Sequence, residues 1–154
     1  MDKVKLSAGN LTILIAGVVI LIASFLAFDK ISLPSFDEGG IHIGGGTHSF
    51  SAWSSHYFLI ATIPALLGVV MALHVALVAF APQVSMPGSV LGFSWNQVHL
   101  ILAGQATIMM IAFLIQDRGL DRGIGLYLML LAAIALLIGA ILRIQERGSA
   151  PPLG

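Results

Sequence analysis

The sequence predicts an all-α membrane protein, a bundle of four transmembrane helices with a long glycine-rich outer loop between helices 1 and 2. Two observations lead to this prediction. The 154 residues are 58% hydrophobic and only 9% charged, a composition outside the usual range of a soluble domain. The chain also contains four apolar runs whose lengths are close to the roughly 20 helical residues that cross a bilayer core.

The predicted spans cover residues 11–28, 57–80, 95–116 and 124–142, and the whole chain, 1–154, is treated as a single domain. Charged residues fall in the connections and at the ends rather than inside the spans. The first span follows two lysines, as a secretory signal would, but it is too long and lacks a small-residue cleavage site. It is therefore expected to be a retained helix.

Four spans place both termini on the same side of the membrane. The positive-inside rule assigns that side from the basic residues, of which four flank the termini and three lie in the first and third connections. With the long first connection outside, both termini are predicted to be cytoplasmic in a multi-pass plasma-membrane protein. The net charge of zero argues against nucleic-acid binding, and the absence of cysteine excludes thiolate chemistry.

Small residues recur at helical spacing in the second and last spans. In lipid, apolar helices gain little from burial against one another, so close approach at small residues favours their association. An alanine-rich chain can also produce such stripes by composition alone. The predicted packing seam consists of Ala61, Ala65, Gly68, Ala72, Ala76, Gly125, Ala132 and Gly139.

Two histidines, His74 and His99, lie inside spans and near the same membrane face. Such a pair could provide both axial ligands of a haem b. At 3.6 residues per turn, however, His74 points about 160° away from the small-residue stripe of its own helix, whereas His99 shares a face with Ala103. If the stripe faces inward, the two imidazoles should not meet, so no cofactor is predicted and hydrogen bonding is the expected role.

Polar side chains inside spans rarely face lipid. His74, on the face opposite the stripe, and Gln105, near the middle of the third span, therefore need cover from outside the bundle. We expect them to contact a partner together with Trp53, which ends the outer loop. The predicted partners are other integral membrane proteins or copies of the same chain, besides the lipid bilayer.

The outer loop carries three histidines, His42, His48 and His56, that could bind a metal ion. Their spacings of six and eight residues match no compact ligand motif, so no metal site is predicted. The loop is instead expected to cap the outer mouth of the bundle as an extended piece or hairpin, with Ser54 or Ser55 capping the second helix.

No motif for catalysis or transport is found. The chain contains no nucleotide-binding loop, carboxylate cluster or nucleophile-base pair, and none of its seven acidic residues lies deep in a span. The predicted function is that of a non-enzymatic accessory or scaffold subunit of a larger plasma-membrane complex. The alternatives are a haem-b electron-transfer subunit using His74 and His99, and a small-molecule or lipid carrier, which would need a polar cavity.

Two elements carry a resemblance in residue detail: Ser51-Ala52-Trp53 at the end of the outer loop, and residues 121–140, DRGIGLYLMLLAAIALLIGA. Together with the layout of the spans, they resemble the small four-helix integral membrane proteins of actinobacteria, which are largely without assigned function. In that group an acidic residue often follows the tryptophan, whereas Ser54, Ser55 and His56 follow here. The resemblance implies an actinobacterial plasma membrane and an accessory role.

Overall fold

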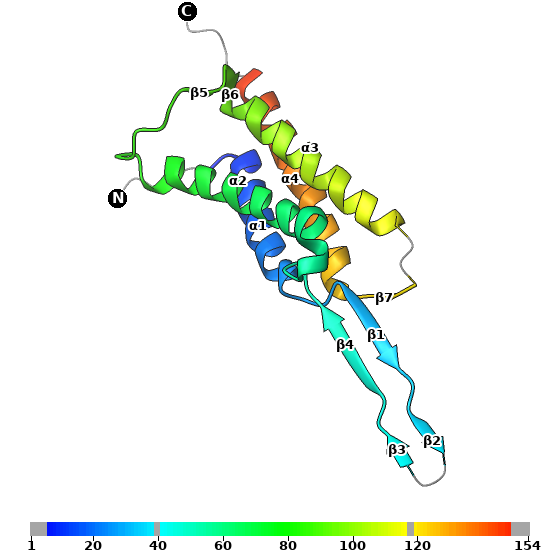
Figure 1. The fold of residues 1–154 in the computed structure, drawn as a ribbon. Helices are drawn as coiled ribbons and strands as arrows, with labels where there is room; N and C mark the ends of the chain where they lie inside the picture. Colours follow the sequence, from blue (N-terminus) through cyan, green and yellow to red (C-terminus); the bar gives the residue numbers. More distant parts are fainter. Residues whose placement is uncertain (1–5, 39–40, 117–118, 149–154) are drawn as a thin grey trace, which may run out of the picture.

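In the computed structural model, four helices form a bundle and a thin β-ribbon extends from one end of it (Figure 1). The structure describes residues 6–38, 41–116 and 119–148. The prediction of four helices is confirmed; a small sheet is also present, whereas the sequence led us to expect only a short extended piece or hairpin in the outer loop. The helices are α1 (Ala8–Ser24), α2 (Ile63–Phe80), α3 (Trp95–Ile115) and α4 (Ile124–Gly148).

Three helical segments are long and apolar enough to cross a membrane: Phe58–Phe80, Trp95–Ile115 and Ile124–Glu146. The first helix is apolar but shorter, at 17 residues, and it ends before Phe25 rather than at residue 28. It ends early because the chain leaves the helix to enter the ribbon, where the Phe28 amide donates a hydrogen bond to the Phe50 carbonyl at 2.7 Å.

The second helix begins in an irregular way. A 3-10 turn (Ser55–Tyr57) and a π-helical turn (Phe58–Thr62) precede α2, and Pro64 lies in the first turn of α2. Proline is tolerated there because the first amides of a helix have no partner within the helix. Ser54 is the residue before the 3-10 turn, but its side chain makes no capping hydrogen bond.

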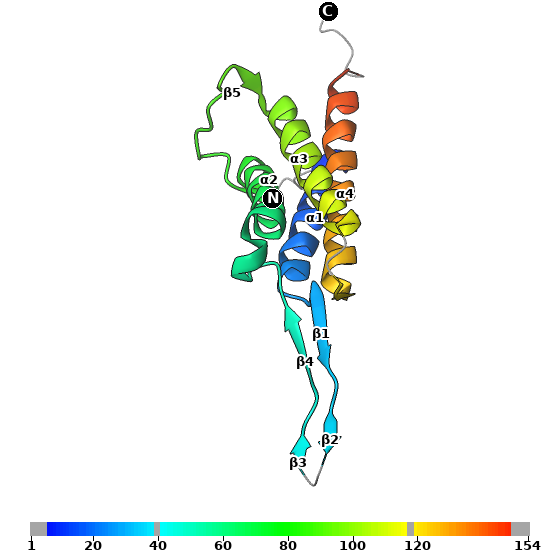
Figure 2. The ribbon, with the colours of Figure 1, turned by 45° about the vertical axis from the view of Figure 1, so that its right-hand side comes forward.

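The segment predicted as a glycine-rich loop forms a ribbon of four short strands instead. The strands are β1 (Asp29–Leu33), β2 (Phe36–Glu38), β3 (Ile41–Ile43), β4 (Gly46–Phe50) and β7 (Asp121–Arg122). The first and last strands of the ribbon, β1 and β4, pair antiparallel from Asp29 opposite Phe50 to Leu33 opposite Gly46. A further strand, β7 from the third connection, pairs with Asp29 and Lys30 at the base of the ribbon. The ribbon points away from the helices (Figure 2), so the expectation that it caps the bundle mouth is wrong.

The connection from α2 to α3 contains a second, smaller hairpin of β5 (Ser89–Val90) and β6 (Phe93–Ser94). Leu91 and Gly92 form its turn with φ of 52° and 84°, as two-residue hairpin turns require. Ser94 then begins α3 in a capping box with Gln97, which fixes the start of the helix on which the polar residues described below lie.

The bundle packs closely at glycine. In the structure α1 lies against both α2 and α4, and α3 lies against α2 and α4. A Cβ atom added to Gly139 would lie 2.8 Å from Ile13 Cγ1, and one added to Gly68 would lie 2.6 Å from Ile20 Cγ2. Of the predicted seam, six residues are buried and Ala72 and Ala76 are half-buried; the buried six are Ala61, Ala65, Gly68, Gly125, Ala132 and Gly139.

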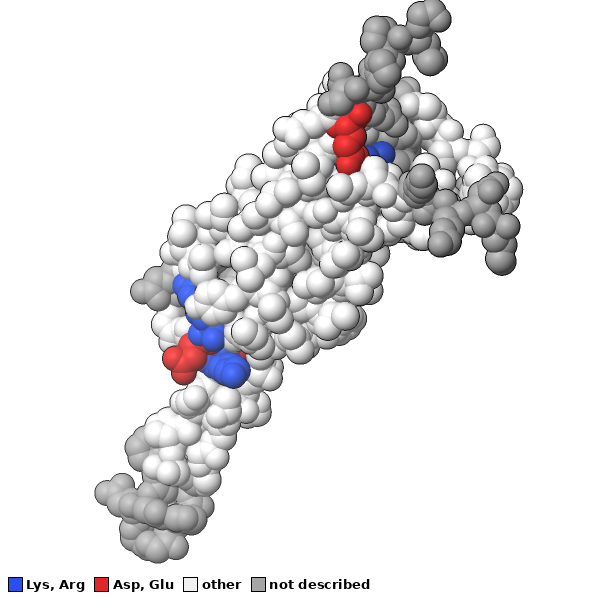
Figure 3. Space-filling view, turned by 180° about the vertical axis from the view of Figure 1, so that it is seen from behind, with Lys and Arg blue, Asp and Glu red and all other residues white. Residues whose placement is uncertain are grey.

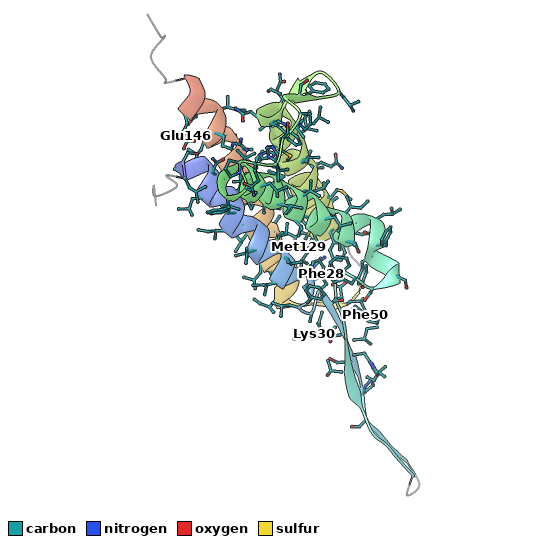
Figure 4. All side chains as sticks on the ribbon, turned by 90° about the vertical axis from the view of Figure 1, so that its left-hand side faces the viewer. Phe28, Lys30, Phe50, Met129 and Glu146 are labelled. Atoms are coloured by element: carbon teal, nitrogen blue, oxygen red, sulfur yellow. The ribbon has the colours of Figure 1, made fainter. Side chains whose placement is uncertain are left out.

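Charged side chains gather at the two ends of the bundle, with an uncharged surface between them (Figure 3). Figure 4 shows Lys30 and Phe50 at the base of the ribbon and Glu146 at the opposite end, with Met129 and Phe28 inside the helical part. At that opposite end, the Gly9 amide of α1 donates a hydrogen bond to Glu146 Oε1 of α4 at 3.0 Å. The uncharged surface is the part of the molecule that suits a bilayer.

Candidate functional site

A group of polar and aromatic side chains lies at the end of the bundle opposite the ribbon. It is built from the second half of α2, the first two turns of α3 and the last part of α4. These parts lie at the same end because successive helices run in opposite directions. We call it the polar cluster: His74, Trp95, Asn96, His99 and Arg143. Four of these residues are buried and Trp95 is half-buried.

The imidazole of His74 lies between α2 and α3. Its ring stacks on the indole of Trp95, with the ring centroids 3.7 Å apart and the planes 18° apart. It also forms an edge-to-face pair with His99, with the centroids 4.8 Å apart and the planes at 88°. His74 is only 5% exposed, so its side chain faces the interior of the bundle rather than lipid.

This contact corrects the expectation that His74 and His99 would not meet. The helical-angle argument assumed that α2 buries a single face, that of the small-residue stripe. In the structure α2 packs on more than one helix: Gly68 and Ala72 lie against Gly17 of α1, while His74 faces α3. His74 is therefore covered by its own chain rather than by an external partner.

His99 is held by a cation. The Arg143 Nη1 group contacts His99 Nδ1 at 2.5 Å, and both residues are buried. A guanidinium group has donors only, so Nδ1 must accept, and the ring proton then lies on Nε2. The contact therefore selects one neutral tautomer of His99 and gives the buried arginine an acceptor.

Several polar atoms of the cluster are buried without a hydrogen-bond partner in the described part of the chain. They are both ring nitrogens of His74, Nε2 of His99 and Oδ1 of Asn96. Such atoms cost free energy unless water or another group satisfies them. Chemically, the cluster provides imidazole and amide groups beside a fixed cation, and it contains neither a carboxylate nor a hydroxyl.

The haem b alternative can be tested against this geometry. A bis-histidine haem requires the two imidazoles on opposite sides of one porphyrin plane. Here the rings of His74 and His99 contact each other, and the indole of Trp95 covers a face of His74. A porphyrin cannot lie between them in this arrangement, so these residues do not fit the group.

Part of the polar cluster was missed from sequence. Trp95, Asn96 and Arg143 are not among the site residues predicted from the sequence. A signal was present, because Trp95, Asn96 and His99 occupy one helical turn at a span start, and Arg143 follows the last apolar run at the same end. These residues form a cluster only because the bundle places α3 beside α4.

At the ribbon end of the bundle, the segment Ser51-Ala52-Trp53 contacts both the end of α1 and the π-helical turn that precedes α2. The Trp53 indole donates to Ser24 Oγ at 2.9 Å and stacks on Phe25. The Ala52 carbonyl accepts from Thr62 Oγ1 at 2.6 Å. Trp53 itself remains 40% exposed, so this expected partner contact is placed on the surface, beside the base of the ribbon.

A second buried polar pair lies where the base of the ribbon meets the helical bundle. The Tyr57 hydroxyl donates to Asp29 Oδ2 at 2.8 Å, and the two residues are 8% and 2% exposed. Tyr57 also packs edge-on against Phe113 of α3, with the ring centroids 5.3 Å apart. The pair therefore fixes the first residue of β1 to the helical bundle.

The remaining candidate residues are separated from one another. Gln105 lies on the exposed surface of α3. His48 is exposed in β4, whereas the side chains of His42 and His56 lie outside the described residues. In the described part of the chain, no group of three or more His, Cys, Asp or Glu side chains could hold a metal ion.

Comparisons with known proteins add no family to this geometry. The chain matches no protein-family model, and searches of curated proteins and of solved structures give no significant match. The resemblance to small actinobacterial membrane proteins therefore stays a prediction from the sequence. Function has to be argued from the bundle and the ribbon themselves.

Proposed function

We propose that this protein is a non-enzymatic accessory or scaffold subunit of a larger plasma-membrane complex. The ribbon is the observation that carries the proposal. Beyond the base, the described side chains of β1 and β4 are exposed: Ser32 and Leu33 of β1, and the residues of β4 up to Ser49. A two-stranded ribbon of this kind is marginally stable alone and presents unpaired backbone groups along its edges.

In contrast to the exposed part of the ribbon, its base is fixed to the helical bundle. Asp29 is bonded to Tyr57, the Phe28 amide to Phe50, and β7 pairs with the first two residues of β1. An arm held at its base and open along its edges is suited to contact a neighbouring protein outside the membrane, where a partner strand can satisfy the free edge.

The exposed amide of Gln105 supports the same function. It lies ten residues after Trp95 and ten before Ile115, the ends of α3, and a polar group at that depth calls for a polar partner. The distribution of basic residues favours cytoplasmic termini with the ribbon outside. An actinobacterial plasma membrane is proposed from the sequence resemblance.

Affinity purification in mild detergent, followed by mass spectrometry, tests the role. The decisive variant replaces residues 34–45 by Asn-Gly, which closes the ribbon at the paired residues Leu33 and Gly46. A matched control, Val84→Ala, changes an exposed side chain in the α2–α3 connection at the other end of the bundle. We expect partner proteins with the full chain and the control, and their loss with the shortened ribbon.

Two results would contradict the proposal. One is a full-length chain that purifies without any other protein. The other is a shortened variant that keeps every partner. A reduced-minus-oxidised absorbance spectrum of the same preparation tests the haem alternative, and a haem band would favour an electron-transfer role.

A further inference from the structure

The outer face of α3 carries an amide at the middle of the membrane. Gln105 is exposed and equidistant from the two ends of the helix. Its side chain makes no hydrogen bond to any residue that the structure describes. Among the described residues of the four helices, no other exposed polar side chain lies more than two turns from a helix end. Hydrocarbon offers such an amide no partner, so another protein group has to supply one.

The residues around Gln105 permit a close approach. Ile101, Gln105, Ile108 and Ala112 follow one another at steps of three or four, and Gly104 lies beside Gln105 on the same side of α3; we call these five residues the α3 outer face. Gly104 differs from the glycines inside the bundle. A Cβ added there would meet no atom within 4 Å, whereas one added to Gly68 or Gly139 would meet a neighbouring helix within 3 Å.

Gly104 is therefore not needed for close packing against another described helix of the same chain. A glycine beside an amide on an exposed helix face lets a second helix approach closely, and the amide can then bond across the contact. Gly104 and the Gln105 amide lie on the same side of α3 and at the same depth.

We propose that the α3 outer face is the contact of a homodimer in which the Gln105 amides of two copies bond to each other. The inference rests on the proposed role as a subunit and names one partner, a second copy. Copies inserted in one membrane share their orientation, so a two-fold axis must run along the membrane normal. Identical residues then meet at identical depth.

The chemistry of the side chain completes the argument. A Gln amide has both a carbonyl acceptor and N–H donors, so it can pair with its own copy. A different protein would need a polar group at the same depth, whereas a second copy supplies one automatically. The same axis directs the two ribbons to one side of the membrane, where they remain open to other partners.

Because the chain contains no cysteine, single-cysteine cross-linking in native membranes can test the contact. Ile108→Cys places a thiol on the α3 outer face while keeping Gln105. Leu131→Cys on α4 is the matched control, since Ile108 and Leu131 are 65% and 63% exposed. With a mild oxidant we expect a covalent dimer from Ile108→Cys and none from Leu131→Cys.

A second variant tests the amide itself. Adding Gln105→Leu to Ile108→Cys should lower dimer formation on the order of tenfold. The thermal stability of the dissociated bundle in detergent should not change, because the Gln105 side chain is not part of the core. A drop in that stability would indicate a structural role within the chain and overturn the proposal.

The remaining outcomes separate this inference from the accessory role. If Ile108→Cys gives no dimer while ribbon-dependent partners are still recovered, the homodimer is wrong and the accessory role stands. Equal cross-linking of Ile108→Cys and Leu131→Cys indicates random collision and also overturns the homodimer. An Ile108→Cys dimer that Gln105→Leu weakens, in a protein without other partners, supports the homodimer and contradicts the larger complex.

Discussion

At the scale of single residues, two glycines in apolar helices differ in what surrounds them. A Cβ at Gly139 would lie 2.8 Å from Ile13 Cγ1 and 3.1 Å from the Gly9 carbonyl oxygen. Gly139→Ala should therefore destabilise the bundle by about 1–3 kcal/mol through overpacking. Gly104→Ala, measured on the dissociated bundle, is the control, because its Cβ would meet nothing within 4 Å in the single chain. Thermal unfolding in detergent measures both variants, and equal midpoints would contradict the prediction.

The contact of His99 with Arg143 gives a second prediction at this scale. His99→Leu removes an acceptor of a buried guanidinium, and the cost should be about 1–3 kcal/mol. His99→Gln keeps a carbonyl acceptor and should recover part of the loss. The comparison uses thermal unfolding of purified protein. If the Leu variant is as stable as the parent, the contact does not contribute to folding.

The two histidines of the polar cluster, His74 and His99, were only partly predictable from the sequence. The depth of His74 and His99 was predictable from their places in the spans, but the direction of His74 was not. Helical angles relate residues within α2 and contain no information on how many neighbours that helix has. Since α1 and α3 cover different sides of α2, a residue opposite the small-residue stripe is still buried.

At the scale of elements, the ribbon should be protected at its base and open beyond it. Tyr57→Phe removes the hydrogen bond to Asp29, the first residue of β1. We expect faster amide hydrogen exchange at Phe28 and across the β1–β4 pairs, because the base loses a buried anchor. Tyr127→Phe, at a 45% exposed tyrosine of α4, should leave exchange unchanged. Unchanged exchange in both variants would show that the pair does not anchor the ribbon.

Helices and strands differed in how well the sequence revealed them. The helices follow from apolar length, which bilayer thickness constrains. The strands are short, and Pro34 and Gly44 interrupt them, so their alternation is weak. The pairing of Asp29 with Arg122 joins segments more than 90 residues apart, and no local pattern reveals such a contact. The end of α1 was missed for the same reason, since the ribbon decides where that helix stops.

At the scale of the whole molecule, the fold gives the bundle two different ends. One carries the ribbon and β7, and the other carries the α2–α3 connection with β5 and β6 (Figure 1). The Gly9–Glu146 hydrogen bond also lies at that second end. If the helices span the membrane, these ends lie in different compartments. The margin of basic residues predicts that the ribbon end lies outside.

Labelling with a membrane-impermeant maleimide tests this assignment, since the natural chain has no thiol to interfere. His48→Cys is exposed in β4 of the ribbon, and Val84→Cys is exposed at the other end. In intact cells we expect labelling of His48→Cys alone. Val84→Cys should react only after permeabilisation, which controls for thiol accessibility. Labelling of Val84→Cys alone would invert the orientation, and labelling of both in intact cells would contradict a fixed spanning topology.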